Sequence, residues 1–149
     1  MSSKIKKDPR ISKQQRMVID IFHTSNYLDD KMSKVLKTFG ITHPQFNIVK
    51  NLQAAYPEAM SVKEIKETIM FKNSDVTRLL DRLVNKGLLE RNTCPVNRRQ
   101  VDIKITDKGS KLIDSIMDRF NDTMDNFFED IVTKEEALRT SEILRRLRE

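Results

Sequence analysis

The sequence contains a single cysteine, no tryptophan, three glycines and four prolines in 149 residues. One cysteine cannot form a disulfide within the chain, so stability has to come from a hydrophobic core, which a chain of about this length can bury. No apolar run approaches the roughly 20 residues that a membrane-spanning helix needs, and the basic first residues lead into no secretory signal. We therefore expect one cytoplasmic domain over residues 1–149 and no membrane partner.

Catalytic and metal-binding patterns are also missing. The sequence shows no nucleophile paired with a base, no glycine-rich phosphate loop and no metal motif. His23 and His43 with one cysteine have no zinc-site spacing, so we expect structural roles for both histidines. An enzyme, a metal and a cofactor are therefore not expected.

The scarcity of glycine and proline predicts a mostly helical chain. Helix starts are marked by a hydroxyl residue followed three positions later by Glu or Gln, which can cap each other's backbone. The pairs are Ser12 with Gln15, Thr42 with Gln45, Ser61 with Glu64, and Thr133 with Glu136. Apolar periodicity then predicts helices over residues 13–39, from 42 to the Tyr56-Pro57 break, 62–69, from Asn73 or Ser74 to Gly87, 106–131, and from 133 onwards.

The periodicity changes from 3.6 to 2 after Gly87. Val101, Ile103 and Ile105 alternate with polar residues, which indicates a half-buried strand, and residues 88–93 are its expected partner. Residues 94–99 then form the connecting loop. Since two strands alone are only marginally stable, this hairpin must pack on the preceding helices. The predicted fold is mainly α with a small β-hairpin.

Positive charge is concentrated in the amino-terminal arm and in the block that holds this hairpin. The net charge is +6, with six basic and one acidic side chains in residues 1–16, and eleven basic and seven acidic in residues 61–109. This distribution indicates a polyanionic partner.

The helices over residues 62–69 and from 73 or 74 to 87 are joined by a short turn, residues 70–72, as in a helix-turn-helix, whose second helix enters the DNA major groove. The hairpin that follows would lie beside the DNA backbone, and arginine at its tip is favoured by the negative potential of the minor groove. The candidate contacts with double-stranded DNA are Asn73, Ser74, Thr77, Arg78 and Arg82 on the helix, and Arg98 and Arg99 at the hairpin tip.

The stretch SVKEIKETIMFKNSDVTRLLDRLVNKGLLERNTCPVNRRQVDIKITDKG, with a recognition helix ending in Lys-Gly and a wing closing in Thr-x-x-Gly, resembles the MarR-type winged helix-turn-helix transcriptional regulators. The resemblance implies a winged unit over about 42–105 and dimerisation helices over about 11–39 and 107–148. It also implies a bacterial homodimer that binds a pseudopalindromic operator, usually as a repressor released by a small ligand or by cysteine oxidation. The family's wing usually carries Asp-x-Arg, whereas this chain keeps Arg99 and has Asn97 in place of the aspartate.

Three further expectations concern partners. Phe127 and Phe128 would be exposed on a monomer, which favours a dimer, unless their helix packs against the helix over residues 13–39 within one chain; both can hold together. Cys94 is either an oxidation sensor or an ordinary cysteine. The side chains that line an effector crevice or belong to the core are Phe22, Tyr27, Phe39, His43 and Phe46. The competing function is a winged-helix module that binds a protein through its hairpin, with no specific DNA binding and only a shallow salt dependence.

Overall fold

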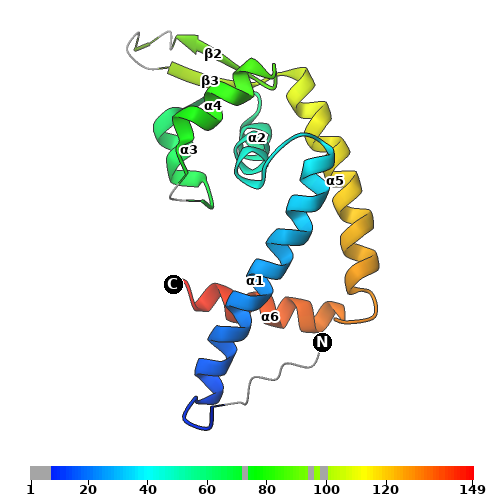
Figure 1. The fold of residues 1–149 in the computed structure, drawn as a ribbon. Helices are drawn as coiled ribbons and strands as arrows, with labels where there is room; N and C mark the ends of the chain where they lie inside the picture. The colour runs from blue at the N-terminus through cyan, green and yellow to red at the C-terminus, as the bar shows by residue number, and fades with distance from the viewer. Residues whose placement is uncertain (1–7, 72–73, 94–95, 98–100) are drawn as a thin grey trace.

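The computed structural model of the protein describes residues 8–71, 74–93, 96–97 and 101–149. In Figure 1 the sheet and α2 to α4 form one end of the molecule, α1 and α5 extend away from it, and α6 crosses near the far part of α1. The elements in chain order are α1 (Lys13–Thr38), α2 (His43–Ala55), β1 (Met60–Ser61), α3 (Val62–Thr68), α4 (Val76–Asn85), β2 (Leu89–Thr93), β3 (Val101–Ile105), α5 (Asp107–Phe128) and α6 (Lys134–Arg146).

The four predicted capping boxes are all present, at Ser12, Thr42, Ser61 and Thr133. In each, the hydroxyl oxygen accepts a hydrogen bond from the backbone N–H three residues on, and the Gln or Glu at that position accepts one in return. These bonds satisfy N–H groups that have no partner within the first helical turn. The predicted starts of α1, α2, α3 and α6 are therefore confirmed.

The start of α4 differs from the prediction. The helix begins at Val76, and its cap is Asp75, whose carboxylate accepts from the backbone N–H of Arg78 at 3.2 Å. The expectation that this helix begins at Asn73 or Ser74 is wrong, because a carboxylate caps as well as a hydroxyl or amide and Asp75 directly precedes the first buried residue. Ser74 lies in a bend before the helix, and Asn73 lies outside the described residues. The connection from α3 to α4 consequently covers residues 69–75, which is longer than the turn predicted over residues 70–72.

The predicted hairpin is present, with β2 and β3 paired antiparallel from Leu89 opposite Ile105 to Thr93 opposite Val101. A third strand, β1, pairs with the other edge of β3 and places Met60 opposite Ile103. The sheet order is β1-β3-β2. Sequence reasoning missed β1, because two residues are too few to show a period and Ser61 also caps α3.

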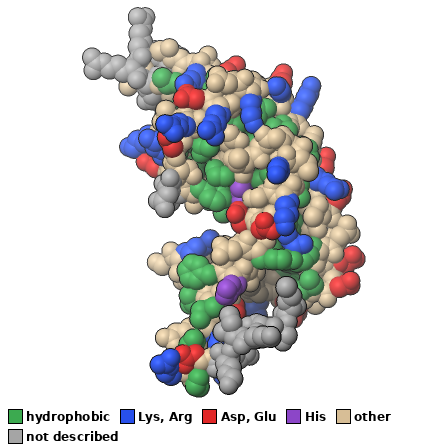
Figure 2. Space-filling model, in the orientation of Figure 1, with side chains coloured by type: hydrophobic (Ala, Val, Ile, Leu, Met, Phe, Trp, Pro, Cys, Tyr) green, Lys and Arg blue, Asp and Glu red, His purple; other side chains and the backbone are tan. Residues whose placement is uncertain are grey.

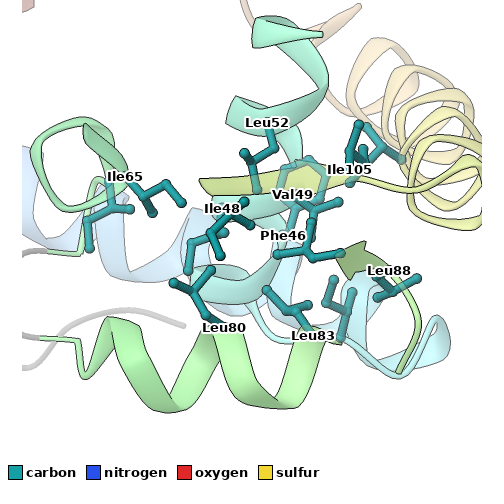
Figure 3. Close-up of a cluster of buried hydrophobic side chains, with 14 of the residues drawn as sticks. Phe46, Ile48, Val49, Leu52, Ile65, Leu80, Leu83, Leu88 and Ile105 are labelled. Atoms are coloured by element: carbon teal, nitrogen blue, oxygen red, sulfur yellow. The ribbon is translucent and has the colours of Figure 1, made fainter. Parts of the chain in front are cut away.

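The hydrophobic core is centred on α2. Figure 3 shows Ile48, Val49 and Leu52 of α2 among side chains from the neighbouring helices and the sheet. The same cluster includes Leu36 from the end of α1, and Ile113, Ile116 and Phe120 from the first two thirds of α5, with the rings of Phe46 and Phe120 packed edge to face at a centroid distance of 5.5 Å. The core thus continues past residues 42–105 into both long helices.

The middle of α1 and the far end of α5 make an aromatic contact. The ring centre of Tyr27 in α1 lies 6.2 Å from that of Phe127 in α5, and the ring centres of Phe127 and Phe128 are 4.8 Å apart. The ammonium of Lys31 lies 4.2 Å from the Phe127 ring centre. Phe127 and Phe128 are consequently half-buried within one chain, so the expectation that a monomer leaves them exposed is wrong. No helix in the described part of the chain is long and apolar enough to span a membrane.

Candidate nucleic-acid interface

α4 has one buried and one exposed side. Val76, Leu80 and Leu83 are buried against the core, since they recur at three- and four-residue steps. Thr77, Arg78 and Arg82 are exposed along the other side. Of the remaining predicted contacts, Ser74 is half-buried just before the helix, whereas Asn73, Arg98 and Arg99 lie outside the described residues.

The N-terminus of α4 carries its own anion. The Asp75 carboxylate caps the helix and lies 3.4 Å from the Nε atom of Arg78. It therefore offsets part of the positive helix dipole that would attract a phosphate. Both side chains are largely exposed, so Arg78 can exchange this weak ion pair for a nucleic-acid contact at small cost.

Two asparagines of α2 hold the connection between α3 and α4. The Asn47 side chain accepts a hydrogen bond from the backbone N–H of Met70 at 2.9 Å, and Asn51 donates to the Thr68 carbonyl at 3.3 Å. These bonds fix where the chain leaves α3, and hence where α4 begins. Sequence reasoning missed both residues, because a polar residue on a half-buried helix face is not distinguished by its spacing.

The C-terminal end of α4 is tied to both long helices. Lys86 ends α4, and its ammonium donates a hydrogen bond to the carbonyl of Gly40, which follows α1. Lys108 in the first turn of α5 donates to the carbonyl of Lys86 at 2.7 Å. Gly40 has a φ of +69°, a conformation that other residues rarely adopt. The end of α1, the end of α4 and the start of α5 therefore meet at Lys86.

The Thr-x-x-Gly motif closes the wing onto this junction. The Thr106 hydroxyl donates to the carbonyl of Gly87 at 2.7 Å and accepts from the N–H of Gly109 at 3.1 Å. Gly109 is buried, and a Cβ placed there would lie 2.9 Å from Ile105 Cγ1 and closer still to the Leu88 carbonyl oxygen. Glycine is required at this position because the chain leaving α4 passes directly against α5.

Charge is unevenly spread over the surface. Figure 2 shows many Lys and Arg side chains, with some Asp and Glu among them, over the end of the molecule that carries α4 and the wing, and several Asp and Glu side chains, with some Lys and Arg among them, along the side where α5 runs. A polyanion would be attracted to the first surface and repelled by the second.

A cavity of about 880 Å³ lies where α1 meets α2 and α4. His43 and Phe71 line it together with Arg82 and Lys86 of the α4 end. The Nδ1 atom of His43 contacts the Asp29 carboxylate, and its ring packs edge-on against Phe71 at 4.9 Å. Among the side chains expected to line such a crevice, His43 does so, whereas Phe22, Tyr27, Phe39 and Phe46 do not.

No group of three or more His, Cys, Asp and Glu residues in the described ranges could hold a metal ion. His23 is exposed on α1, and Cys94 lies outside the described residues.

A helix-turn-helix followed by a wing, with long helices before and after it, defines a winged helix-turn-helix protein. The sequence model of the MarR family matches residues 41–101. The regulator PecS of Dickeya dadantii is 30% identical over 112 residues, which cover 74% of this chain and 68% of PecS. The regulator PrsX of Escherichia coli is 27% identical over 104 residues, which cover 69% of this chain and 63% of PrsX, a little under two thirds of its length.

Solved structures with a similar fold include further MarR regulators. A cysteine-to-serine mutant of MarR from Escherichia coli, complexed with operator DNA, is 25% identical with a TM-score of 0.72, over 86% of this chain and 91% of that one. A MarR family regulator from Silicibacter pomeroyi has the same fold with a TM-score of 0.75 at 19% identity, over 95% of this chain and 96% of that one. The protein belongs to the MarR family. It is a transcription regulator and not an enzyme, as the sequence predicted.

Proposed function

We propose that the protein is a sequence-specific DNA-binding transcriptional regulator that binds a pseudopalindromic operator as a homodimer in the bacterial cytoplasm. The observation that carries the proposal is the exposed side of α4. Thr77, Arg78 and Arg82 lie there on a helix fixed at both ends, next to a wing, on a fold shared with a relative solved on operator DNA. Arg78 would bond bidentately to guanine, and Thr77 to a base or a phosphate.

The dimer is supported by apolar side chains on α1 and α6. Phe22 is 67% exposed and Leu138 is 72% exposed, and Val18 and Leu147 are also exposed. A second copy covering these side chains would remove them from water. Two recognition helices held in this way would meet major grooves about one helical turn, ~34 Å, apart.

Operator selection tests the proposal. The full chain is incubated with a random duplex pool at about 150 mM salt, a concentration at which nonspecific binding is weak, and bound DNA is sequenced. We expect a pseudopalindrome with half-sites about ten base pairs apart, lost in Arg78→Ala and Arg99→Ala. Arg119→Ala on the exposed side of α5 is the matched control and should select the same site. Enrichment of no sequence would contradict the proposal and favour the protein-interaction module.

Dimerisation is tested separately by sedimentation velocity. Phe22→Asp should shift the protein towards monomer, because it places a charge in the proposed interface. Thr24→Asp adds the same charge to α1 at an exposed polar position that does not share a helix face with Phe22, and it is the control. A monomeric unmodified chain at the concentrations used for DNA binding would contradict the dimer.

Repression and its release by a small ligand complete the proposal, on the basis of the family resemblance and of the cavity beside α4. Its volume is within the ~300–1,000 Å³ usual for ligand sites, and its lining joins α1 and α2 to Arg82 and Lys86. A reporter gene placed behind the selected operator should be silenced by the chain. A compound that restores expression should lose its effect in Ser33→Phe, which fills the cavity; persistence of the effect would place the ligand elsewhere.

A further inference from the structure

Asp81 is an acidic residue on the exposed side of the recognition helix. It lies three residues after Arg78 and one before Arg82, so the three side chains occupy one region of the helix surface. A carboxylate on a helix that approaches phosphates is repelled by them. Unless it serves another purpose, Asp81 opposes the binding to which the two arginines contribute.

The structure places Asp81 in contact with the wing. Its Oδ1 atom lies 2.6 Å from the Nη2 atom of Arg91, which is on β2, and the side chains are 49% and 38% exposed. The pair joins α4 directly to a strand of the wing. At this distance it is a charge-assisted hydrogen bond, the stronger kind.

Among the described residues of the wing, most of β2 is exposed on this side. In β2 Leu89 is buried, whereas the next four residues, Glu90 to Thr93, are exposed. The ion pair is therefore formed beyond the last buried residue of β2, where the strand leaves the core. Further along, the wing has Asn97 where the resembled pattern has an aspartate.

We propose that the Asp81–Arg91 ion pair braces the wing against the recognition helix, and that both are positioning residues for DNA binding. The separation of α4 and the wing decides whether major-groove and minor-groove contacts form at once. If that separation is already held before binding, the wing does not have to be ordered when the DNA binds, and the entropic cost of ordering it is avoided. The inference rests on the proposed function.

The brace predicts that DNA affinity changes in the direction opposite to the one that charge alone predicts. Asp81→Asn removes a negative charge from the surface facing DNA, so electrostatics alone predicts tighter binding. The brace predicts weaker binding, because the wing is no longer held. Arg91→Gln should weaken binding by a similar factor, and the double variant should be no worse than the weaker single variant, since either change alone breaks the contact.

The experiment uses the full chain and the duplex that the unmodified chain selects from a random pool. Affinity for this duplex is measured for Asp81→Asn, Arg91→Gln and the double variant over a range of salt. We expect each single variant to weaken binding about two- to fivefold, the range of a partly exposed ion pair. The slope of log affinity against log salt should not change, and each variant should lose no more stability to urea than a partly exposed ion pair contributes, so that all remain folded in the binding assay.

Asp30→Asn is the matched control. It makes the same substitution and breaks an exposed ion pair, that of Asp30 with Lys34 at 2.6 Å on α1, away from α4 and the wing. It should leave DNA affinity unchanged.

Three outcomes would overturn the brace. Binding by Asp81→Asn that is equal or tighter makes Asp81 only a repelling charge. Additive losses, with a salt slope reduced by about 0.9 in Arg91→Gln, make Arg91 a phosphate contact. A changed base preference in Asp81→Asn alone makes Asp81 a base contact. If the unmodified chain selects no sequence, the proposed function fails and the brace with it; if it selects one that Asp81→Asn binds equally well, only the brace fails.

Discussion

Gly109→Ala should destabilise the protein although it improves the helix in which it lies. Gly109 is in the first turn of α5, where alanine is favoured over glycine by about 1 kcal/mol. The added Cβ would lie 2.9 Å from Ile105 Cγ1, 3.2 Å from the Leu88 carbonyl carbon and closer still to the carbonyl oxygen. The neighbours cannot move away cheaply, because that oxygen accepts a hydrogen bond from the N–H of Thr106 at 3.1 Å.

The magnitude follows from these opposing effects. Overpacking against backbone costs about 1–3 kcal/mol, and weakening the Leu88 hydrogen bond adds about 1 kcal/mol. After subtracting the helix preference, the free energy of unfolding should fall by about 2 kcal/mol. Because the contact joins the start of β2 to α5, the variant should also bind the operator less tightly.

Urea unfolding at neutral pH measures this change. Gly40→Ala is the control, because its Cβ would have no neighbour within 4 Å while its φ of +69° is strained for alanine. That strain costs about 1–2 kcal/mol. A Gly109→Ala protein as stable as the unmodified chain, beside a destabilised Gly40→Ala protein, would refute the argument that close approach rather than φ requires Gly109.

Three further predictions test the fold and its junctions. Ile48→Ala empties a fully buried position of α2 and should lower the free energy of unfolding in urea by about 2–5 kcal/mol. The Ser61 hydroxyl and backbone N–H donate to Glu64 and lower its pKa from the ordinary 4.5, so the stabilisation is full above that value and lost as the pH falls through the lower folded pKa; the shift of the urea midpoint in Glu64→Gln should therefore be largest at pH 7 and shrink as the pH is lowered below 4.5. Lys86→Met removes the donor to Gly40 and should weaken operator binding in a fluorescence anisotropy titration, whereas unchanged affinity would show that the junction does not orient α4.

The sequence predicted those parts of the fold that depend on local chemistry. The capping residues at Ser12, Thr42, Ser61 and Thr133 form bonds within three residues, so their pattern is readable without tertiary structure. The start of α4 was placed too early because Asn73, Ser74 and Asp75 are all good caps, and which one is used depends on where the core begins, at Val76. β1 was missed because its two residues pair with a strand about 40 positions later.

The candidate site likewise has one part that the sequence predicted and another part that it did not. The exposed placement of Thr77, Arg78 and Arg82 follows from helix periodicity, and the structure shows them on one side of α4. Their contact with DNA remains a prediction. The Asp81–Arg91 pair and the Asn47 bond to Met70 were not predicted. Both join residues that are distant in sequence, and an ion pair between two elements leaves no periodic signal.

The continuous core has a consequence for how operator affinity is set. α4 packs on α2, and α2 shares its buried side chains with Leu36 of α1 and Ile113 of α5. Lys86 adds a polar link from α4 to the end of α1. The recognition helix therefore cannot turn independently of the long helices, because a rotation would open the core and expose apolar surface. In the proposed dimer, the angle between α1 and α5 would then decide the spacing of the two recognition helices. A substitution at Phe127, where α5 contacts α1, should therefore change operator affinity although Phe127 does not approach the DNA.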